Sequence, residues 1–275
     1  MIDHDRAHRF YEMHQQGTFV LPNAWDAGSA AVIAATGAAA VATTSSGISW
    51  ALGVADGEQL QRDEMIAMVA RIVRAVDVPV SADVEAGYGS TPSDVAVTID
   101  AVIEAGAVGA NIEDRLRTGG TPLWPLEQQC DRLTAARAAA ARGGGRFVLN
   151  ARTDVYLASV GEPSEREDMV LQRAEQYRRA GADCLFVPGL IDLDAIGRLV
   201  MRSPLPLNIL LAPGRGPNIA QLTQAGVRRI SVGHTIAAAA YGVARRAARE
   251  LLAGTDHALL DGISHPEMQQ LMMGK

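Results

Sequence analysis

Charged side chains follow three short apolar segments of this chain. One segment leads to Asp83 and Glu85, the next to Glu113, and a third to Arg152 and Asp154. Acids and an arginine at neighbouring strand ends of one sheet are costly to bury unless a metal ion or an anion lies among them. The pattern therefore indicates an enzyme active site.

The acids of this group are candidate metal ligands. Asp83, Glu85 and Glu113 offer only hard oxygen donors, and no cysteine lies near them in the sequence. Such a set suits Mg²⁺, with Mn²⁺ able to take its place, and does not suit zinc. The alternative is a structural ion-pair network in which the same acids pair with Arg115 or Arg152.

Three further features could act on a bound carboxylate. The planar fork of Arg152 could clamp it through two hydrogen bonds, or could instead be buried against Asp154. His234 is either a catalyst or a histidine that only makes hydrogen bonds. A strand-to-loop turn could cradle an oxyanion with its backbone N–H groups. Its residues are Thr44, Ser45, Ser46, Gly47 and Ile48.

Alternating apolar and amphipathic segments must position these residues. Eight segments have strand character, most of them as continuous apolar runs typical of parallel strands covered on both faces. They are Phe19–Ala24, Ala39–Thr44, Val78–Asp83, Val108–Glu113, Phe147–Ala151, Cys184–Val187, Leu207–Leu211 and Arg229–Val232. The helices expected between and after them are Ala27–Thr36, Leu60–Val76, Pro92–Ala105, Leu126–Arg142, Glu165–Ala180, Leu193–Met201, Ile219–Ala225 and Ile236–Ala253.

Eight strand-then-helix units predict an α/β fold, a (β/α)8 TIM barrel in one domain of residues 1–275. A doubly wound open sheet is the alternative. The barrel is expected at about 18–253, with an N-terminal helix at Asp5–Gln15 and a C-terminal extension at about 256–275 that contains a helix, His265–Met273. In a barrel the charged strand ends listed above all lie on one face, where active sites of this fold are built.

Composition excludes several classes of partner. The net charge is −6 and no long basic run occurs, so neither nucleic acid nor an anionic membrane is an expected partner. No stretch reaches the roughly 18 apolar residues of a membrane span, and the N-terminus lacks an apolar signal core. We therefore expect a soluble, cytoplasmic protein. Its two cysteines, Cys130 and Cys184, are expected to be small buried or half-buried residues.

The order and spacing of several motifs resemble the isocitrate lyase/phosphoenolpyruvate mutase superfamily. The resemblance covers about residues 21–253 and is strongest with small bacterial members, which include methylisocitrate lyases, oxaloacetate decarboxylases and phosphonopyruvate hydrolases. The motifs are Ser46-Gly-Ile48, Leu52-Gly-x-x-Asp56, Asp83-x-Glu85-x-Gly-Tyr-Gly89, Ile112-Glu-Asp114 and Ala151-Arg-Thr-Asp154.

The resemblance implies roles for individual residues. Asp83 would bind Mg²⁺ directly, while Glu85 and Glu113 would act through water. Arg152 would clamp the substrate, a small 2-oxo or 2-hydroxy carboxylate, and Asp56 would stand near the reacting group on a mobile loop. The segment Ser46–Ile48 would bind the substrate carboxylate or oxo group, and Asn208 a distal carboxylate. The superfamily also implies a homotetramer in which protomers exchange the last barrel helix, here Ile236–Ala253.

Two departures from the superfamily pattern affect the expected reaction. Glu85 stands where a second aspartate is usual. The expected lid, Asp114–Trp124, lacks both the Lys-Lys/Arg-Cys-Gly-His of isocitrate and methylisocitrate lyases and the Lys-Thr-Asn-Ser of phosphonate mutases. Since the lyase cysteine donates a proton, this chain must obtain that proton elsewhere.

The expected function is a Mg²⁺-dependent lyase. It would cleave a C–C bond of a small 2-hydroxy or 2-oxo dicarboxylate of the isocitrate or methylisocitrate type, through an enolate or alkoxide held against the metal. Two alternatives stay open. One is a decarboxylase or hydrolase of oxaloacetate-like or phosphonopyruvate-like acids. The other is a weakly active 2-oxo acid binding protein.

Overall fold

A computed structural model describes residues 2–116, 122–260 and 262–273. Their nine strands form one sheet in which every pairing is parallel, in the order β1-β9-β8-β7-β6-β5-β4-β3-β2. The strands are β1 (Phe19–Leu21), β2 (Asn23–Ala24), β3 (Val41–Thr43), β4 (Val80–Asp83), β5 (Gly109–Glu113), β6 (Val148–Arg152), β7 (Cys184–Phe186), β8 (Leu207–Leu210) and β9 (Arg229–Ser231).

The sheet closes on itself through its first predicted strand. That strand is divided at Pro22 into β1, which pairs with β9, and β2, which pairs with β3. Proline has no N–H to donate to a sheet ladder, which explains the break. Asn23 ties the two sides together, because its Oδ1 accepts the backbone amides of Val232 and Gly233 at 3.0 and 2.9 Å. The predicted eight-stranded barrel is therefore confirmed, with its first strand in two pieces.

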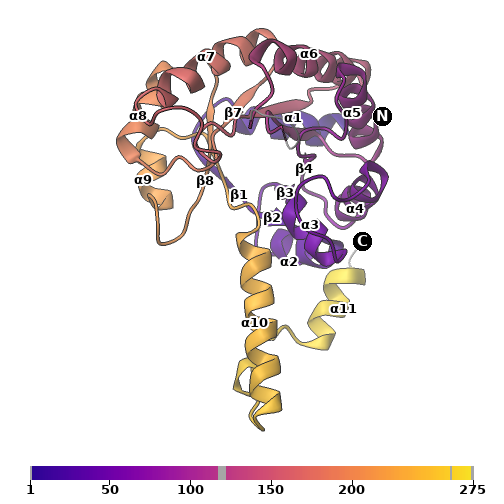
Figure 1. Ribbon diagram of the computed structural model, residues 1–275. Coiled ribbons are helices and arrows are strands. Elements are labelled where there is room, and N and C mark those ends of the chain that lie inside the picture. Colours follow the sequence, from indigo (N-terminus) through magenta and orange to yellow (C-terminus); the bar gives the residue numbers. More distant parts are fainter. Residues whose placement is uncertain (1, 117–121, 261, 274–275) are drawn as a thin grey trace.

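Helices surround the barrel (Figure 1). They are α1 (His4–Met13), α2 (Ala27–Ala35), α3 (Ser45–Ala51), α4 (Arg62–Arg74), α5 (Pro92–Glu104), α6 (Leu126–Arg142), α7 (Arg166–Arg179), α8 (Leu193–Arg202), α9 (Ile219–Gln224), α10 (Thr235–Leu252) and α11 (His265–Met273), with a 3-10 turn at His257–Leu259. Within the described residues, no helix is long and apolar enough to cross a membrane.

Local sequence explains where several helices begin. Asp26 and Thr91 cap α2 and α5 with side-chain hydrogen bonds, and Pro92 occupies the first turn of α5, where its missing N–H costs nothing. The short helix α3 was not expected. The predicted turn at residues 44–48 is instead the start of this helix, because Thr44 adopts an extended backbone and its side chain accepts the amide of Gly47.

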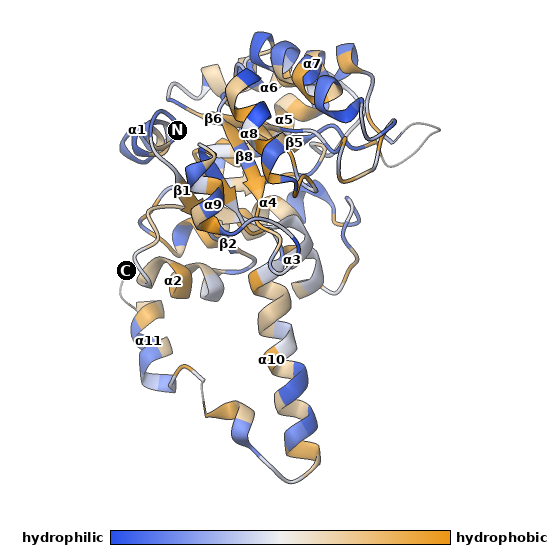
Figure 2. Ribbon diagram, turned by 90° about the vertical axis from the view of Figure 1, so that its left-hand side faces the viewer, coloured by the Kyte–Doolittle hydropathy of each residue, from blue (hydrophilic) through white to orange (hydrophobic). Residues whose placement is uncertain are grey.

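Helix α10 projects away from the barrel, whereas α11 returns to lie near α2 (Figures 1 and 2). Only Ala237 and Ala247 of α10 are buried, and Leu252 near its end is 92% exposed. In Figure 2, hydrophilic and hydrophobic residues alternate along the part of α10 that is farther from the barrel. This helix therefore contributes little to the core of its own barrel.

Candidate active site

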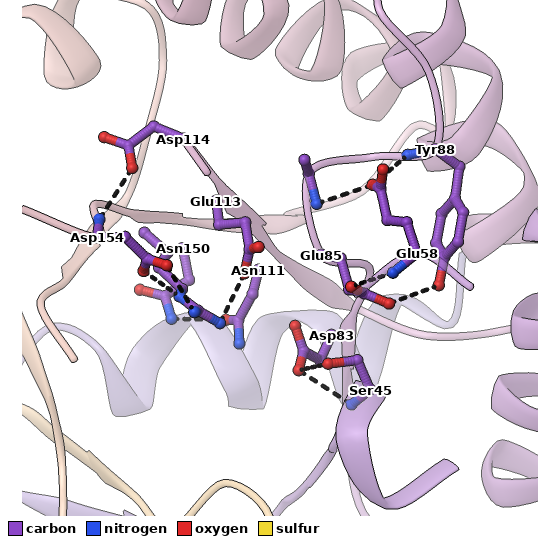
Figure 3. Close-up of polar contacts among 12 residues, drawn as sticks. Ser45, Glu58, Asp83, Glu85, Tyr88, Asn111, Glu113, Asp114, Asn150 and Asp154 are labelled. Carbon is purple, nitrogen blue, oxygen red and sulfur yellow. Dashed lines mark hydrogen bonds and ion pairs between the residues drawn. The ribbon is translucent and has the colours of Figure 1, made fainter. Parts of the chain in front are cut away.

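Carboxylates from β4 and β5 face one another at the C-terminal ends of the strands (Figure 3). Asp83 is the last residue of β4, Glu113 the last of β5, and Arg152 the last of β6. Because parallel strands in register bring their ends to one edge, Glu113 lies directly beside Arg152. The convergence expected from the sequence is thus present for these three side chains.

Asp83 is oriented by the start of α3. Its Oδ2 accepts the backbone amide of Ser45 at 3.0 Å and the Ser45 hydroxyl at 2.8 Å, while its own amide donates to Thr43 Oγ1. The other carboxylate oxygen, Oδ1, is buried and has no hydrogen-bond partner among the described residues. An unpartnered buried carboxylate oxygen is costly, and it is the kind of atom that a cation would stabilise.

Glu85 belongs to the loop that follows β4 and is almost fully buried. Its Oε2 accepts the backbone amide of Glu58 at 2.7 Å, and its Oε1 accepts the hydroxyl of Tyr88 at 3.3 Å (Figure 3). Burial, and then the negative charges of Glu85 and Asp83, raise the pKa of Tyr88. Tyr88 therefore stays protonated and can keep donating to Glu85.

Arg152 lies between two acids. Its Nη1 is 2.7 Å from Glu113 Oε2, and its Nε and Nη2 donate to the two carboxylate oxygens of Asp154 at 2.7 and 3.0 Å. Desolvation lowers the pKa of Arg152, but Glu113 and Asp154 outweigh it and the net shift is upward. Of the ion pairs considered from the sequence, those of Arg152 with Glu113 and with Asp154 are present, and Arg152 is a permanent cation between them.

Asp114 points away from this group, although it adjoins Glu113. It is fully buried, accepts the amide of Asp154 and the hydroxyl of Tyr177, and pairs with Arg173 at 3.1 Å. Burial raises the pKa of Asp114 despite the opposing charge of Arg173. Its contacts fasten the end of β5 to α7, so its role in the structure is one of support.

Gly47 has no room for a side chain. A Cβ there would lie 2.7 Å from Thr44 Cγ2 and 2.8 Å from Trp25 Cβ. The glycine thus lets α3 begin close to β2, which places Ser45 against Asp83. The amides of Gly47 and Ile48 donate hydrogen bonds to Thr44. Of the backbone amides expected to cradle an oxyanion, that of Ser46 has no hydrogen-bond partner within the described first turn of α3.

Asn208, which the resemblance assigns to a distal carboxylate of the substrate, lies inside the barrel below the strand ends. It is the second residue of β8, fully buried, and donates to Ser231 Oγ at 2.9 Å. Its Oδ1 accepts from Asn150, whose amide also donates to Asn111 Oδ1 at 2.6 Å. Arg229 donates to Asn111 as well, at 3.2 Å. These side chains form a polar layer beneath the carboxylates.

Two expected catalytic residues lie at the margin of the group. Asp56 is exposed on the loop between α3 and α4. His234 is exposed at the start of α10, where its ring packs edge-on against Trp50 at 5.3 Å. Neither makes a contact with Asp83, Glu85 or Glu113 within the described part of the chain.

The expected lid is described only at its two ends, because residues 117–121 lie outside the described residues. At its base, Arg115 pairs with Leu123 in an antiparallel bridge, and the Trp124 amide donates to the Asp114 carbonyl at 2.8 Å. Cys130 is half-buried in α6 and Cys184 is buried in β7, where burial raises the pKa of its thiol to about 12. Both cysteines lie in the elements expected for them.

The donor set fits a hard divalent cation bound mainly through one residue. Among the described residues, no three His, Cys, Asp or Glu side chains lie close enough to bind one metal ion directly. Asp83 Oδ1 is nevertheless buried and unpartnered, and Glu85 and Glu113 stand on the neighbouring loop and strand. Mg²⁺, which keeps several waters when it binds proteins, suits one direct carboxylate with others behind water.

Three residues with roles at this site were missed by the sequence analysis. Tyr88 belongs to the loop after β4 and donates to Glu85, while Glu58 and Arg132 contact this loop from other elements. Tyr88 lies inside a recognised motif and could have been considered. Glu58 and Arg132 lie in segments that read as an exposed loop and an ordinary helix, so no sequence signal distinguished them.

Comparison with known proteins gives a consistent result. A family model described as "Phosphoenolpyruvate phosphomutase" matches residues 10–252. A Mycobacterium tuberculosis (strain H37Rv) protein is 36% identical over 248 residues, 89% of each chain. The 2-methylisocitrate lyase of Escherichia coli (strain K12) is 32% identical over 148 residues, which are 52% of this chain and 47% of the relative. The structure of oxaloacetate acetylhydrolase with the inhibitor 3,3-difluorooxalacetate superposes with a TM-score of 0.86 at 25% identity, covering 97% of this chain and 92% of that one.

Proposed function

The chain belongs to the phosphoenolpyruvate phosphomutase family, within the isocitrate lyase/phosphoenolpyruvate mutase superfamily, and from this premise we propose that it is a Mg²⁺-dependent lyase. Its substrate would be a small 2-hydroxy or 2-oxo dicarboxylate, in which it breaks a carbon–carbon bond. Superfamily members are carbon–carbon lyases or mutases, which supports an enzyme of this general kind.

The observation that carries the proposal is the unpartnered Oδ1 of Asp83 among the converging strand ends. Asp83 would hold the metal directly, and Glu85 and Glu113 would do so through water. Mg²⁺ at this position would supply Lewis-acid polarisation of the substrate's 2-oxygen and carboxylate.

Arg152 would recognise the substrate's negative charge. Its three contacts to Glu113 and Asp154 use three of the five guanidinium donors. Among the described residues the other two donors have no hydrogen-bond partner, so they would bind a substrate carboxylate while the two acids keep the guanidinium plane fixed. The amide of Ser46 would donate to a second substrate oxygen, since first-turn amides lack partners within their own helix. Both groups are oriented before the substrate arrives, so they stabilise developing charge without reorganising.

The reaction also needs two proton transfers. When the C2–C3 bond of a 2-hydroxy acid breaks, its electrons pass to C3, the hydroxyl proton leaves, and C3 takes up a proton. The products are a 2-oxo acid and a second carboxylic acid. Asp56 is the acid proposed to stand near the reacting carbons. It lies on the loop between α3 and α4, and the Glu58 amide of that loop donates to Glu85. His234, water or a hydroxyl of Thr118 or Thr121 would supply the proton to C3, because the expected lid contains no thiol.

A second function is favoured by the same missing thiol. A decarboxylase or hydrolase acting on an oxaloacetate-like or phosphonopyruvate-like acid would have less need of the cysteine acid that the superfamily's isocitrate-type lyases use. The likeness to oxaloacetate acetylhydrolase also supports this second function. In either function, iodoacetamide should leave activity nearly intact.

A substrate panel tests the two functions. The protein is assayed with Mg²⁺ and with EDTA on isocitrate, methylisocitrate, dimethylmalate, oxaloacetate and phosphonopyruvate, and products are identified by mass spectrometry. We expect Mg²⁺-dependent release of a 2-oxo acid and a second acid from one of the first three. Turnover confined to oxaloacetate or phosphonopyruvate would establish the second function. No Mg²⁺-dependent turnover of any of the five would contradict both.

A further inference from the structure

The loop after β4 has a backbone that needs external support. We call residues 84–89 the metal loop, because it carries Glu85. Glu85 and Tyr88 have φ values of 51° and 55°, in the left-handed region that side chains with a Cβ rarely adopt, and Gly87 has a φ of 99°. Such a conformation persists only where the surroundings impose it. The contacts around the metal loop therefore determine where Glu85 points.

Glu58 holds the metal loop by its amides. Its Oε1 accepts the backbone N–H groups of Ala86 and Tyr88 at 3.1 and 3.0 Å, and its own amide donates to Glu85 Oε2 at 2.7 Å (Figure 3). One residue thus binds both the backbone and the functional carboxylate of the loop. Hydrogen bonds that involve a charged partner are about twice as strong as neutral ones.

Arg132 holds the same loop by its carbonyls. This arginine of α6 is 1% exposed, and its Nη1 donates to the Gly89 carbonyl at 2.9 Å while Nη2 donates to the Ala86 carbonyl. Its guanidinium carbon also lies 4.5 Å from the ring centre of Trp124. Ala86 is therefore held through its N–H by an anion and through its C=O by a cation.

We propose that Glu58 and Arg132 are positioning residues that clamp the metal loop from both sides and so aim Glu85 at the cation. They also tie the loop to its two neighbours in the fold. Glu58 is two residues from Asp56, and Arg132 stacks on Trp124, which adjoins the Arg115–Leu123 bridge. The functional meaning of the clamp rests on the proposed function, because it assumes that Glu85 serves a divalent cation.

The clamp predicts a thermodynamic link between the cation and the loop that carries Asp56. If a cation binds Glu85 in the orientation that Glu58 imposes, cation binding must strengthen the hydrogen bonds of Glu58. By the same thermodynamic link, loss of those hydrogen bonds must lower the affinity for the cation by the same factor. The two readouts, loop protection and metal affinity, can be measured separately.

The first test uses the metal-free protein. Amide hydrogen exchange of Ala86 and Tyr88 is measured in the wild type, Glu58→Ala and Glu58→Gln. We expect exchange at least 10-fold faster in Glu58→Ala, and largely restored protection in Glu58→Gln, whose carbonyl oxygen can still accept. Glu64→Ala is the matched control, since Glu64 also accepts a backbone amide, that of Gln61, at 3.1 Å but does not contact the metal loop. Unchanged exchange in Glu58→Ala would overturn the clamp.

The second test measures Mg²⁺ affinity by calorimetry. Glu58→Ala and Arg132→Lys should each weaken binding about 5-fold, while Arg137→Lys should not. Arg137 lies on the same helix and also donates to backbone carbonyls, but to those of Gly181 and Phe147. Because both clamp residues act on one loop, the fold-loss of Mg²⁺ affinity in the double variant should be smaller than the product of the fold-losses in the two single variants.

The outcomes separate the clamp from the proposed function. A wild-type protein that binds no Mg²⁺ would contradict the proposed function, while the exchange of Ala86 and Tyr88 would still decide whether the clamp exists. Faster exchange in Glu58→Ala with wild-type Mg²⁺ affinity would overturn the positioning of Glu85.

Discussion

At the scale of single residues, Asp83 has the clearest consequence. Its Oδ1 is buried without a partner while Oδ2 is held by Ser45. Asp83→Asn keeps the size of the side chain but removes the charge that a cation requires. We expect Mg²⁺ affinity to fall by more than about 100-fold and turnover to be lost with it. Calorimetry checks this, with Asp100→Asn on the surface of α5 as the control. Normal metal affinity in Asp83→Asn would mean that the metal ligand is another residue.

His14 predicts how stability depends on pH. Burial, followed by the positive charge of Arg229, lowers its pKa from 6.5 to about 3, and Arg228 adds to this. Between these values the unfolded chain binds a proton that the folded protein does not. The folded protein therefore loses stability as the pH falls below about 6.5. Between pH 7.5 and 5, His14 alone should lower the free energy of unfolding by about 2 kcal/mol.

His14→Phe removes that titration. The ring of His14 packs between Phe10 and Phe19 at 4.8 and 4.9 Å, so phenylalanine can keep the contacts. When the pH is lowered from 7.5 to 5, the free energy of unfolding measured in urea should fall by about 2 kcal/mol less in the variant than in the wild type. The same loss in both proteins would show that His14 is not buried as a neutral ring.

The limits of sequence reasoning are visible at this scale. Asp83, Glu113 and Arg152 could be predicted because each ends a strand, and strand ends in a parallel barrel share one face. Glu58 and Arg132 could not, because their roles arise where the chain meets itself 28 and 46 positions away. The surroundings of Asn208 could not be predicted either, because it is the second residue of β8 and its hydrogen bonds go to Asn150 and Ser231 on other strands.

At the scale of elements, the start of α3 depends on Gly47. Gly47→Ala would press a methyl group against Thr44 and Trp25 at less than 3 Å and displace the helix that presents Ser45 to Asp83. We expect a loss of about 1–3 kcal/mol in the free energy of unfolding. Gly197→Ala in α8, where nothing lies within 4 Å of the new Cβ, should instead be neutral or stabilising. Equal effects of the two changes in urea unfolding would contradict this account of α3.

Most helices were predicted well, whereas α3 and the division of the first strand were missed. The apolar periodicity of α5, α6 and α10 predicted their first and last residues to within one or two positions, because many residues in each helix follow the same pattern. The helix α3 has only seven residues and contains a glycine, so its first turn read as a loop. The break at Pro22 was likewise missed, although proline lacks the amide that a continuous strand requires.

At the scale of the whole molecule, α10 predicts association. Besides Leu252, its Tyr241, Val243 and Leu251 are exposed, and the helix projects from the barrel. We expect a tetramer, or at least a dimer, in which these side chains are buried against a partner. Light scattering at micromolar concentration checks the mass. Leu251→Glu with Leu252→Glu should shift the protein toward smaller species, whereas Met201→Glu on α8 should not. A wild-type mass of 29 kDa would contradict the prediction.

The division at Pro22 bears on how the protein is made. Among the described strands, β1 pairs only with β9, and Asn23 is bonded to residues as far as 210 positions later in the chain. A ribosome therefore exposes the first strand long before its neighbour exists, and the nascent sheet has two unpaired edges until residue 233 has emerged. Unpaired parallel edges invite pairing with other chains. We expect nascent chains halted before β9 to be protease-sensitive and chaperone-bound, and protection to appear in one step once β9 clears the exit tunnel.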